Sequence, residues 1–554
     1  MNITRNNFRD QFDELKQVIN AANFLAIDCE FTGLSHDNAK VQQYDSPSEY
    51  FHKICQQTSG YIAIQFGLTA FRAKDDDTQD FTYRSYNFFV FPQMRKQRFE
   101  CQGDSMAFLG ANNFDFNMLF REGISYCDEE EAKRMREQFD EKLKLMESCD
   151  NKKNGDEQVV AVPFEEQENM DRLNEEIEQF LESEDDEKSV GKNCNAFQRK
   201  LMYQLLEQRY AETISASSHS ENNQKVILLK KIKSKERLRE IQMEEIDKER
   251  KQMEDAIGFH NFINFLSQTK KLIVGHNMLL DVIYVMKQFV GPVSNKFQDF
   301  KTKTHKTFPN LLDTKFMCTD DTIKPYINSS VLARLLDATS VEPFARPKFE
   351  AEAEKYSYSL DKPKEHEAGY DAFITGVCFV TMANYLQIDS CDINEKSSRL
   401  RPLLNKLFLP IDVNHVNLTG KEPPAPSREH VFHLTIPKDW KNNNIFQIFR
   451  LYGNVRISWL DDTSCFVALH NRENATGLLK TIGKHEGVTI ISFADYKKNM
   501  LTDKATSDPT KRKLETDANR DWSVRLTKFI TFSLIVLSIH YISNYNELNI
   551  FGLK

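Results

Sequence analysis

The feature that most constrains the fold is an apolar run that carries two carboxylates. Residues 23–31 read NFLAIDCEF, which predicts a buried strand bearing Asp28 and Glu30. Because side chains of a strand alternate between its faces, the two carboxylates project from the same side. Buried acids on one face repel each other unless a cation lies between them, and such hard oxygen ligands suit Mg²⁺ or Mn²⁺. Two exposed acids at a strand end would explain the pair equally well in isolation.

Two later segments place acids where the chain enters a helix. Residues 275–281 read GHNMLLD after the strand pattern KLIVG, which puts Asp281 in the first turn of a helix. Residues 366–371 read HEAGYD, with His366 five residues before Asp371 at the start of an apolar helix. A helix acid that complements the macrodipole explains Asp281 alone. A histidine, whose pKa lies near neutrality, can accept a proton from water. The three segments together are more specific than any one of them.

Length and charge limit the remaining possibilities. A chain of 554 residues with 41 Phe is long enough for two or three domains. Its formal charge of −9 argues against coating nucleic acid by bulk attraction, so an RNA partner would need local basic patches. The ten cysteines form no CxxC pair and predict neither a zinc site nor a disulfide framework. The polar first residues lack the apolar segment of a secretory signal.

The order of the three acidic segments resembles the DEDDh exonuclease superfamily, and more narrowly the PARN/Trimmer family of exoribonucleases. The stretches AIDCEFTGL, FDFN, KLIVGHNMLLDV and HEAGYDAFITGV carry the resemblance, which covers roughly residues 1–495. It implies an α/β, RNase H-like fold and a 3′-to-5′ exoribonuclease that hydrolyses phosphodiesters and releases nucleoside 5′-monophosphates. It also implies two Mg²⁺ ions per active site, for which Mn²⁺ can substitute. The residues that it assigns to the metals are Asp28, Glu30, Asp281 and Asp371, and it assigns the general base to His366.

Substrate contacts follow from the resemblance alone. It implies that apolar side chains hold RNA bases and that a lysine contacts phosphate; these residues are Phe31, Leu34, Met106, Phe108 and Lys315. Trp459 matches a tryptophan that stacks on the 5′ cap, where a cationic base over the indole is favourable. Core packing explains the apolar residues equally well, and a structural role would explain Trp459.

Composition shifts suggest the domain boundaries. The segment 165–187 is dense in Asp and Glu and predicts a solvated or disordered linker. We expect a nuclease domain split by an inserted small domain of the single-strand-binding type, followed by an RNA-recognition-like α/β domain. The expected parts are 1–165 (nuclease, first part), 166–250 (insertion and charged linkers), 251–410 (nuclease, second part), 428–496 (RNA-recognition-like), 497–524 (linker) and 525–545 (tail).

The tail predicts a membrane anchor. Residues 529–545 read FITFSLIVLSIHYISNY and follow Arg525 and Lys528, a pattern expected of a C-terminal transmembrane helix. The nuclease would then face the cytosol at the outer mitochondrial membrane, with the endoplasmic reticulum as second choice. A terminal helix docked on the protein is the alternative.

Two functions share the predicted chemistry. The tail favours trimming of piRNA precursors at a membrane surface over poly(A)-specific mRNA deadenylation. Alternatives of other kinds are a catalytically silent RNA-binding scaffold tethered to a membrane and a DNA proofreading exonuclease. The expected partner is single-stranded RNA with a free 3′ end; the resemblance adds a homodimer and a Tudor- or PIWI-type protein that delivers RNA.

Overall fold

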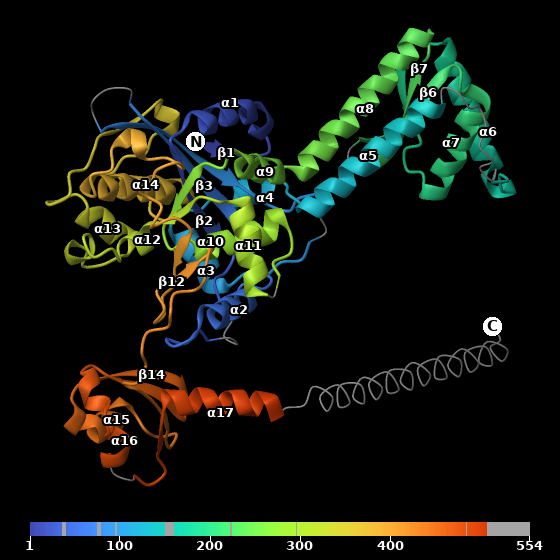
Figure 1. The fold of residues 1–554 in the computed structure, drawn as a ribbon. Helices are drawn as coiled ribbons and strands as arrows, with labels where there is room; N and C mark the ends of the chain where they lie inside the picture. Colours follow the sequence, from blue (N-terminus) through green and yellow to red (C-terminus); the bar gives the residue numbers. More distant parts are fainter. Residues whose placement is uncertain are drawn as a thin grey trace, which may run out of the picture. The chain divides into compact units, whose positions relative to one another are not determined.

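The computed structural model describes residues 1–35, 40–74, 79–94, 97–149, 160–221, 224–294, 296–482 and 485–506. The chain divides into two compact units. The first comprises residues 1–41 and 45–423, and the second comprises residues 42–44 and those from 424 onward. The units are described separately below (Figure 1).

Among the described residues, the main sheet of the first unit has seven strands, in the order β1-β4-β3-β2-β8-β9 with β10 beside β4. Their bounds are β1 (Asn2–Ile3), β2 (Phe24–Phe31), β3 (Ala63–Ala73), β4 (Phe81–Phe89), β8 (Leu272–Gly275), β9 (Leu311–Asp313) and β10 (Phe349–Ala351). Strands β2, β3 and β4 are antiparallel neighbours, whereas β8 and β9 continue the sheet from β2 in parallel. The predicted acidic strand is thus β2, at the centre of the sheet.

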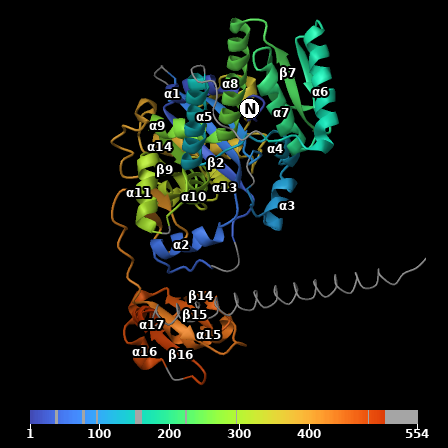
Figure 2. The same cartoon turned by 90° about the vertical axis from the view of Figure 1, so that its right-hand side faces the viewer.

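Helices cover both faces of this sheet (Figures 1 and 2). Phe24 and Ala26 of β2 pack in the same core cluster as α14 (Ala368–Tyr385). Leu25 and Ile27 pack in a second cluster, to which α1 (Phe8–Ala21), α9 (Phe259–Thr269) and α10 (Leu279–Val285) contribute. The alternation along β2 therefore directs its even-numbered side chains toward α14.

Shorter elements complete the first unit. They are α2 (Pro47–Gln57), α3 (Gly103–Ala111), α4 (Phe116–Glu122), α11 (Phe297–Thr307), α12 (Thr314–Met317), α13 (Leu332–Ala338) and the β11–β12 hairpin (Lys406–Phe408 and His415–Asn417). A π-helical turn, Met286–Val290, continues α10. The helix predicted to carry Asp281 in its first turn is therefore present but changes its hydrogen-bonding pattern partway.

The expected insertion separates β4 from β8 in the sequence. Between these strands, α5 (Glu129–Cys149) precedes the expected bounds of 166–250. The elements that lie largely within those bounds are α6 (Phe164–Glu182), β5 (Glu187–Val190), α7 (Ala196–Tyr210), β6 (Ile214–Glu221), β7 (Gln224–Lys231) and α8 (Lys235–Ile257). The predicted linker at 165–187 is wrong, because most of it forms α6. Its apolar residues Met170, Leu173, Ile177 and Phe180 recur at helical spacing and are buried. This periodicity outweighs the density of acids, which occupy the solvated face.

The second unit has a four-stranded antiparallel sheet among its described residues, in the order β14-β15-β13-β16. Its elements are β13 (Val431–Thr435), α15 (Asn442–Phe449), β14 (Val455–Asp461), β15 (Ser464–Leu469), α16 (Leu478–Thr481), β16 (Thr489–Ser492) and α17 (Phe493–Thr506). Tyr496 of α17 stacks on His433 of β13, with ring centroids 4.3 Å apart. The unit has the α/β character that the sequence predicted.

The predicted transmembrane anchor needs correction. No helix in the described part of the chain is both long enough and apolar enough to cross a membrane. This finding contradicts the transmembrane helix of the predicted fold class and the membrane location derived from it; residues 525–545 themselves lie outside the described ranges. The predicted span was already at the short end of the roughly 17–25 residues required, and Ser533, Ser538 and His540 lower its hydrophobicity.

Candidate active site

The predicted acidic residues lie close together at the N-terminal end of α14. Asp28 and Glu30 continue the even-numbered series of β2 and so face α14, whose first turn carries Asp371. Side-chain donor atoms of Glu30, His366 and Asp371 all lie within 4.8 Å of one another. Asp281, in the first turn of α10, is close enough to raise the pKa values of Asp28 and Glu30 by repulsion. The structure thus brings together all five residues predicted to carry the chemistry.

A glycine on β3 lets α14 approach the acidic strand. Gly67 is paired with Asp28 in the β2–β3 register. A Cβ atom at Gly67 would lie 2.0 Å from the carbonyl oxygen of Ala368 at the start of α14. This backbone-to-backbone approach is closer than any side chain allows.

Two amide side chains hold the start of α14 in place. Gln65 Oε1 accepts a hydrogen bond of 2.9 Å from the Ala368 N–H, and Asn87 Oδ1 accepts one of 2.6 Å from the Gly369 N–H. Both donors belong to the first turn, whose N–H groups have no partner within the helix. Sequence reasoning missed Gln65, Gly67 and Asn87, because only the strand pairing shows that they lie opposite the acidic motif.

His366 occupies a strained turn before α14. Its φ of 66° lies in the left-handed region, which residues other than glycine rarely adopt. Its backbone N–H donates a 3.0 Å hydrogen bond to Asp371 Oδ2, and its ring lies 4.5 Å from that of Phe108. The next residue, Glu367, accepts hydrogen bonds from Asn87 (2.5 Å) and from the Tyr358 hydroxyl (2.6 Å). Together these contacts hold the turn that carries the His366 side chain in its uncommon conformation.

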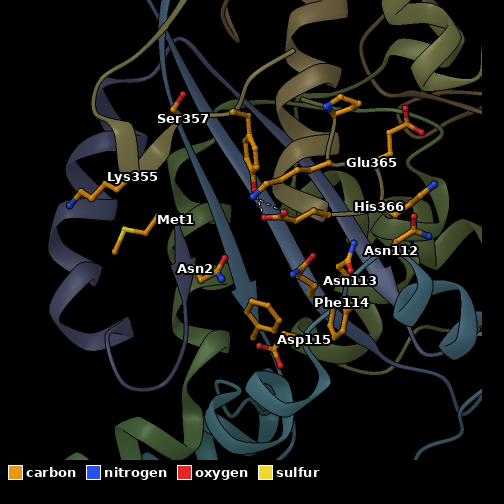
Figure 3. A pocket seen from close by; sticks show the side chains of 16 residues that line it. Met1, Asn2, Asn112, Asn113, Phe114, Asp115, Lys355, Ser357, Glu365 and His366 are labelled. Carbon is orange, nitrogen blue, oxygen red and sulfur yellow. Dashed lines mark hydrogen bonds and ion pairs between the residues drawn. The ribbon is translucent and has the colours of Figure 1, made fainter. Parts of the chain in front are cut away.

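A cavity opens beside this histidine. It measures about 670 Å³ and is lined by residues of the 355–367 segment, by Asn112–Asp115 and by the start of the chain (Figure 3). Lys355 and Lys364 contribute positive charge, whereas Asp115, Glu365 and Glu367 contribute negative charge. The imidazole is therefore accessible from solvent on this side.

The electrostatics of the acidic cluster fit bound cations. Burial, followed by repulsion from Asp281, Asp371 and Glu30, raises the pKa of Asp28 well above its usual value. Burial likewise raises the pKa of Glu30, and it raises the pKa values of Asp281 and Asp371 to about 7. Among the described residues, Asp281 Oδ1 is buried without a hydrogen-bond partner. Crowded carboxylates and an unsatisfied carboxylate oxygen are the features that Mg²⁺ or Mn²⁺ would compensate.

The predicted RNA contacts fall into two groups. Leu34 and Phe108 expose 51% and 47% of their surface, and Met106 lies on α3 with Phe108. Phe31 is instead buried, with its ring stacked on Tyr284 at 4.3 Å. Phe31 therefore lies under the surface, and its ring offers no open face.

The two remaining predicted contacts lie elsewhere. Lys315 is the second residue of α12, and its Nζ lies 5.3 Å from the ring centroid of Phe408. In the second unit, Trp459 is partly buried against the core of its own sheet, and its Nε1 donates a 2.8 Å hydrogen bond to Asn442 Oδ1.

The central acidic strand, the two helix acids and the adjacent histidine form a buried carboxylate cluster beside an imidazole, an arrangement typical of metal-dependent nucleases. The chain belongs to the CAF1 family of ribonucleases, whose model matches residues 3–379. A second model, described as an RNA binding domain, matches residues 420–499. The resemblance to PARN-type exonucleases is thereby confirmed, and the chain is a 3′-to-5′ exoribonuclease.

Several relatives align along most of the chain. The Poly(A)-specific ribonuclease PARN of Xenopus laevis is 35% identical over 94% of this chain and 84% of its own length. The human protein of the same name is 36% identical over 90% of this chain and 80% of its own length. The Pre-piRNA 3'-exonuclease trimmer of Bombyx mori is 26% identical over 90% of this chain and 94% of its own length. The solved structure of S. pombe Pop2p, titled as a Mg2+ and Mn2+ bound form, covers 72% of this chain with 12% identity and a TM-score of 0.35.

Proposed function

We propose that this exoribonuclease removes adenosines from the 3′ ends of poly(A)-tailed RNA and releases 5′-AMP. The observation that supports this substrate is the identity of 35% and 36% with relatives named poly(A)-specific ribonuclease, over at least nine-tenths of the chain. The order of preference in the sequence-based prediction is therefore reversed, because that preference for piRNA precursors depended on the membrane tail.

The proposed mechanism uses the acidic cluster as a cation site. Asp28, Glu30, Asp281 and Asp371 would hold two Mg²⁺ ions, with Mn²⁺ as a substitute. When bound, such ions stabilise charge on the attacking and leaving oxygens of an in-line displacement. His366, fixed by its backbone bond to Asp371, orients the attacking water and accepts its proton. The base thus has both the position and the solvent access that hydrolysis requires.

Substrate binding would use the surface around this base. The exposed faces of Leu34 and Phe108 are apolar, and Phe108 contacts the His366 ring, so bases stacked there would place the last phosphate near the imidazole. We propose that Met106 contributes to this surface and that Phe31 supports it from below. Lys315 would supply a positive charge for a backbone phosphate.

The test compares matched RNAs. Oligonucleotides of equal length, labelled at the 5′ end and ending in A, U or mixed sequence, are incubated with Mg²⁺, and released nucleotides are identified by chromatography. The proposal predicts stepwise shortening with a clear preference for A. An inactive Asp28→Asn protein controls for contaminating nuclease.

A second candidate is trimming of piRNA precursors, supported by the similarity to the Bombyx mori trimmer along 94% of that protein. In the same assay, equal rates on A-tailed and mixed 3′ ends would favour trimming over deadenylation. The comparisons lend no support to the homodimer or to the Tudor- or PIWI-type partner, and neither is proposed.

Trp459 keeps its proposed role in cap binding. Trp459 lies on β14 of the second unit, within the residues that match the RNA binding domain model. This position is compatible with a cap contact. The hydrogen bond to Asn442 fixes the indole plane, which a stacking contact requires.

A further inference from the structure

A buried carboxylate at the end of β9 connects three segments of the chain. Asp313 exposes only 1% of its surface. Its Oδ1 accepts hydrogen bonds from the N–H groups of Asn277 (2.9 Å) and Lys315 (2.9 Å). Its Oδ2 accepts from the N–H groups of Met278 (3.2 Å) and Phe408 (2.9 Å). Each carboxylate oxygen therefore accepts two backbone hydrogen bonds. These bonds offset the cost of burying the carboxylate.

The first of these segments carries a proposed metal ligand. Asn277 and Met278 form the turn between β8 and α10, and Asp281 follows in the first turn of that helix. Asn277 has a φ of 59°, so the turn depends on external bonds to hold an uncommon conformation. Thr314 also contacts the turn, since its Oγ1 lies 3.1 Å from the Gly275 carbonyl oxygen.

The other two segments carry the proposed phosphate contact. The backbone N–H groups of Lys315 and of Phe408, on β11, both donate hydrogen bonds to the Asp313 carboxylate. The Lys315 ammonium lies over the Phe408 ring, 5.3 Å from its centroid. Asp313 thus fixes both the backbone from which the lysine projects and the ring over which its charge rests.

We infer that Asp313 is a positioning residue. Its hydrogen bonds fix the position of the proposed metal ligand Asp281 relative to that of the proposed phosphate contact Lys315. The inference rests on the proposed roles of these two residues. Asp313 would act through the backbone N–H groups of residues 277, 278, 315 and 408, from which its two carboxylate oxygens accept hydrogen bonds. Outer-shell partners of this kind orient ligands that must be held within about half an ångström.

Asp313→Asn is the most direct test, because it keeps the shape of the side chain. The amide nitrogen cannot accept hydrogen bonds, so at least two of the four N–H groups lose their acceptor. We expect Mn²⁺ affinity, measured by calorimetry without RNA, to fall by about tenfold or more, as for other outer-shell substitutions. We also expect KM for oligo(A) at saturating Mn²⁺ to rise, because Lys315 is displaced too.

A matched control separates positioning from general destabilisation. Asp45 is also a buried acid, paired with Lys53 at 2.9 Å, and Asp45→Asn should lower the melting temperature without changing Mn²⁺ affinity or KM. If Asp313→Asn behaved like Asp45→Asn in all three measurements, Asp313 would have only a structural role and the inference would be overturned.

Two further variants test separately the effect on Lys315 and the effect on the 275–278 turn. Phe408→Leu keeps the backbone N–H but removes the ring under Lys315, and it should raise KM while leaving Mn²⁺ affinity unchanged. Thr314→Val removes the hydroxyl beside the 275–278 turn and should weaken Mn²⁺ binding. If Asp313→Asn does not fold, these variants decide the matter: wild-type values for both would overturn the inference.

Asp28→Asn distinguishes failure of the inference from failure of the proposed function. If Asp28→Asn bound Mn²⁺ and cleaved RNA like the wild type, the proposed metal centre itself would be wrong. If Asp28→Asn were inactive while Asp313→Asn retained wild-type Mn²⁺ affinity and KM, only the positioning role would fail.

Discussion

Asp28 and Gly67 are directly paired across two antiparallel strands, so the residue opposite the central acid has no side chain. The start of α14 fills the space that a side chain would occupy, with the Ala368 carbonyl oxygen 2.0 Å from a Cβ built there. The distance between the acids of β2 and Asp371 of α14 therefore depends on the absence of a side chain at Gly67.

Gly67→Ala should displace the first turn of α14, which carries Asp371, together with the preceding turn that carries His366. A displacement of about 1 Å in a catalytic group can cost around a hundredfold in rate, so we expect kcat to fall by about that factor. Steady-state kinetics on oligo(A) provide the measurement. Gly103→Ala is the control, since a Cβ at Gly103 meets nothing within 4 Å; equal activity of the two variants would contradict the argument.

Asp28→Asn should abolish hydrolysis and leave the fold intact. The central acid lies among three other carboxylates, and loss of one ligand from a two-metal site removes charge stabilisation from the transition state. Circular dichroism checks the fold, and release of 5′-AMP checks activity. Activity within about tenfold of the wild type would refute the assignment, since the transition-state charge stabilisation from the metals far exceeds that factor.

The stability of the metal-free protein should fall as pH rises. Burial raises the folded-state pKa values of Asp281 and Asp371 from 3.8 to about 7. Between these values the folded state binds more protons than the unfolded state, so the free energy of unfolding decreases with increasing pH. Melting temperatures in EDTA should drop from pH 5 to pH 8, and Mn²⁺ should reduce the drop. A flat profile in EDTA would contradict this account of the cluster.

His366→Ala should lower kcat much more than it raises KM, because a general base acts on water and not on RNA. The expected loss is about 10²–10⁴-fold in kcat. Steady-state kinetics on oligo(A) at saturating Mg²⁺ provide the measurement. An effect confined to KM would reassign His366 to substrate binding.

Trp459→Ala should leave the shortening of uncapped oligo(A) unchanged, because Trp459 belongs to the second unit. A cap analogue should quench the fluorescence of the wild type and not of the variant, if the indole stacks on the cap. Failure of both proteins to bind the analogue would remove cap recognition from the proposed functions.

The sequence was sufficient to predict the acidic strand and the helices that carry Asp281 and Asp371. Each of these is a local pattern: alternation along β2, and an acid within the first turn of α10 or α14. Gln65, Gly67, Asn87 and Asp313 could not be predicted in the same way, because their roles arise from pairing between strands and from turns distant in sequence. The segment 165–187 failed because charge density was given more weight than the helical spacing of its four apolar residues.

The position of β2 between β3 and β8 has a consequence for how the enzyme is made. Asp28 and Glu30 are synthesised early, whereas Asp281 and Asp371 follow only after the whole insertion has left the ribosome. Until β8 has been translated, the edge of β2 that later pairs with β8 lacks its hydrogen-bonding partner. A translation product that stops after the insertion would therefore carry Asp28 and Glu30 of the proposed metal site without Asp281 and Asp371. The acidic cluster is therefore complete only once Asp371, late in the first unit, has been translated.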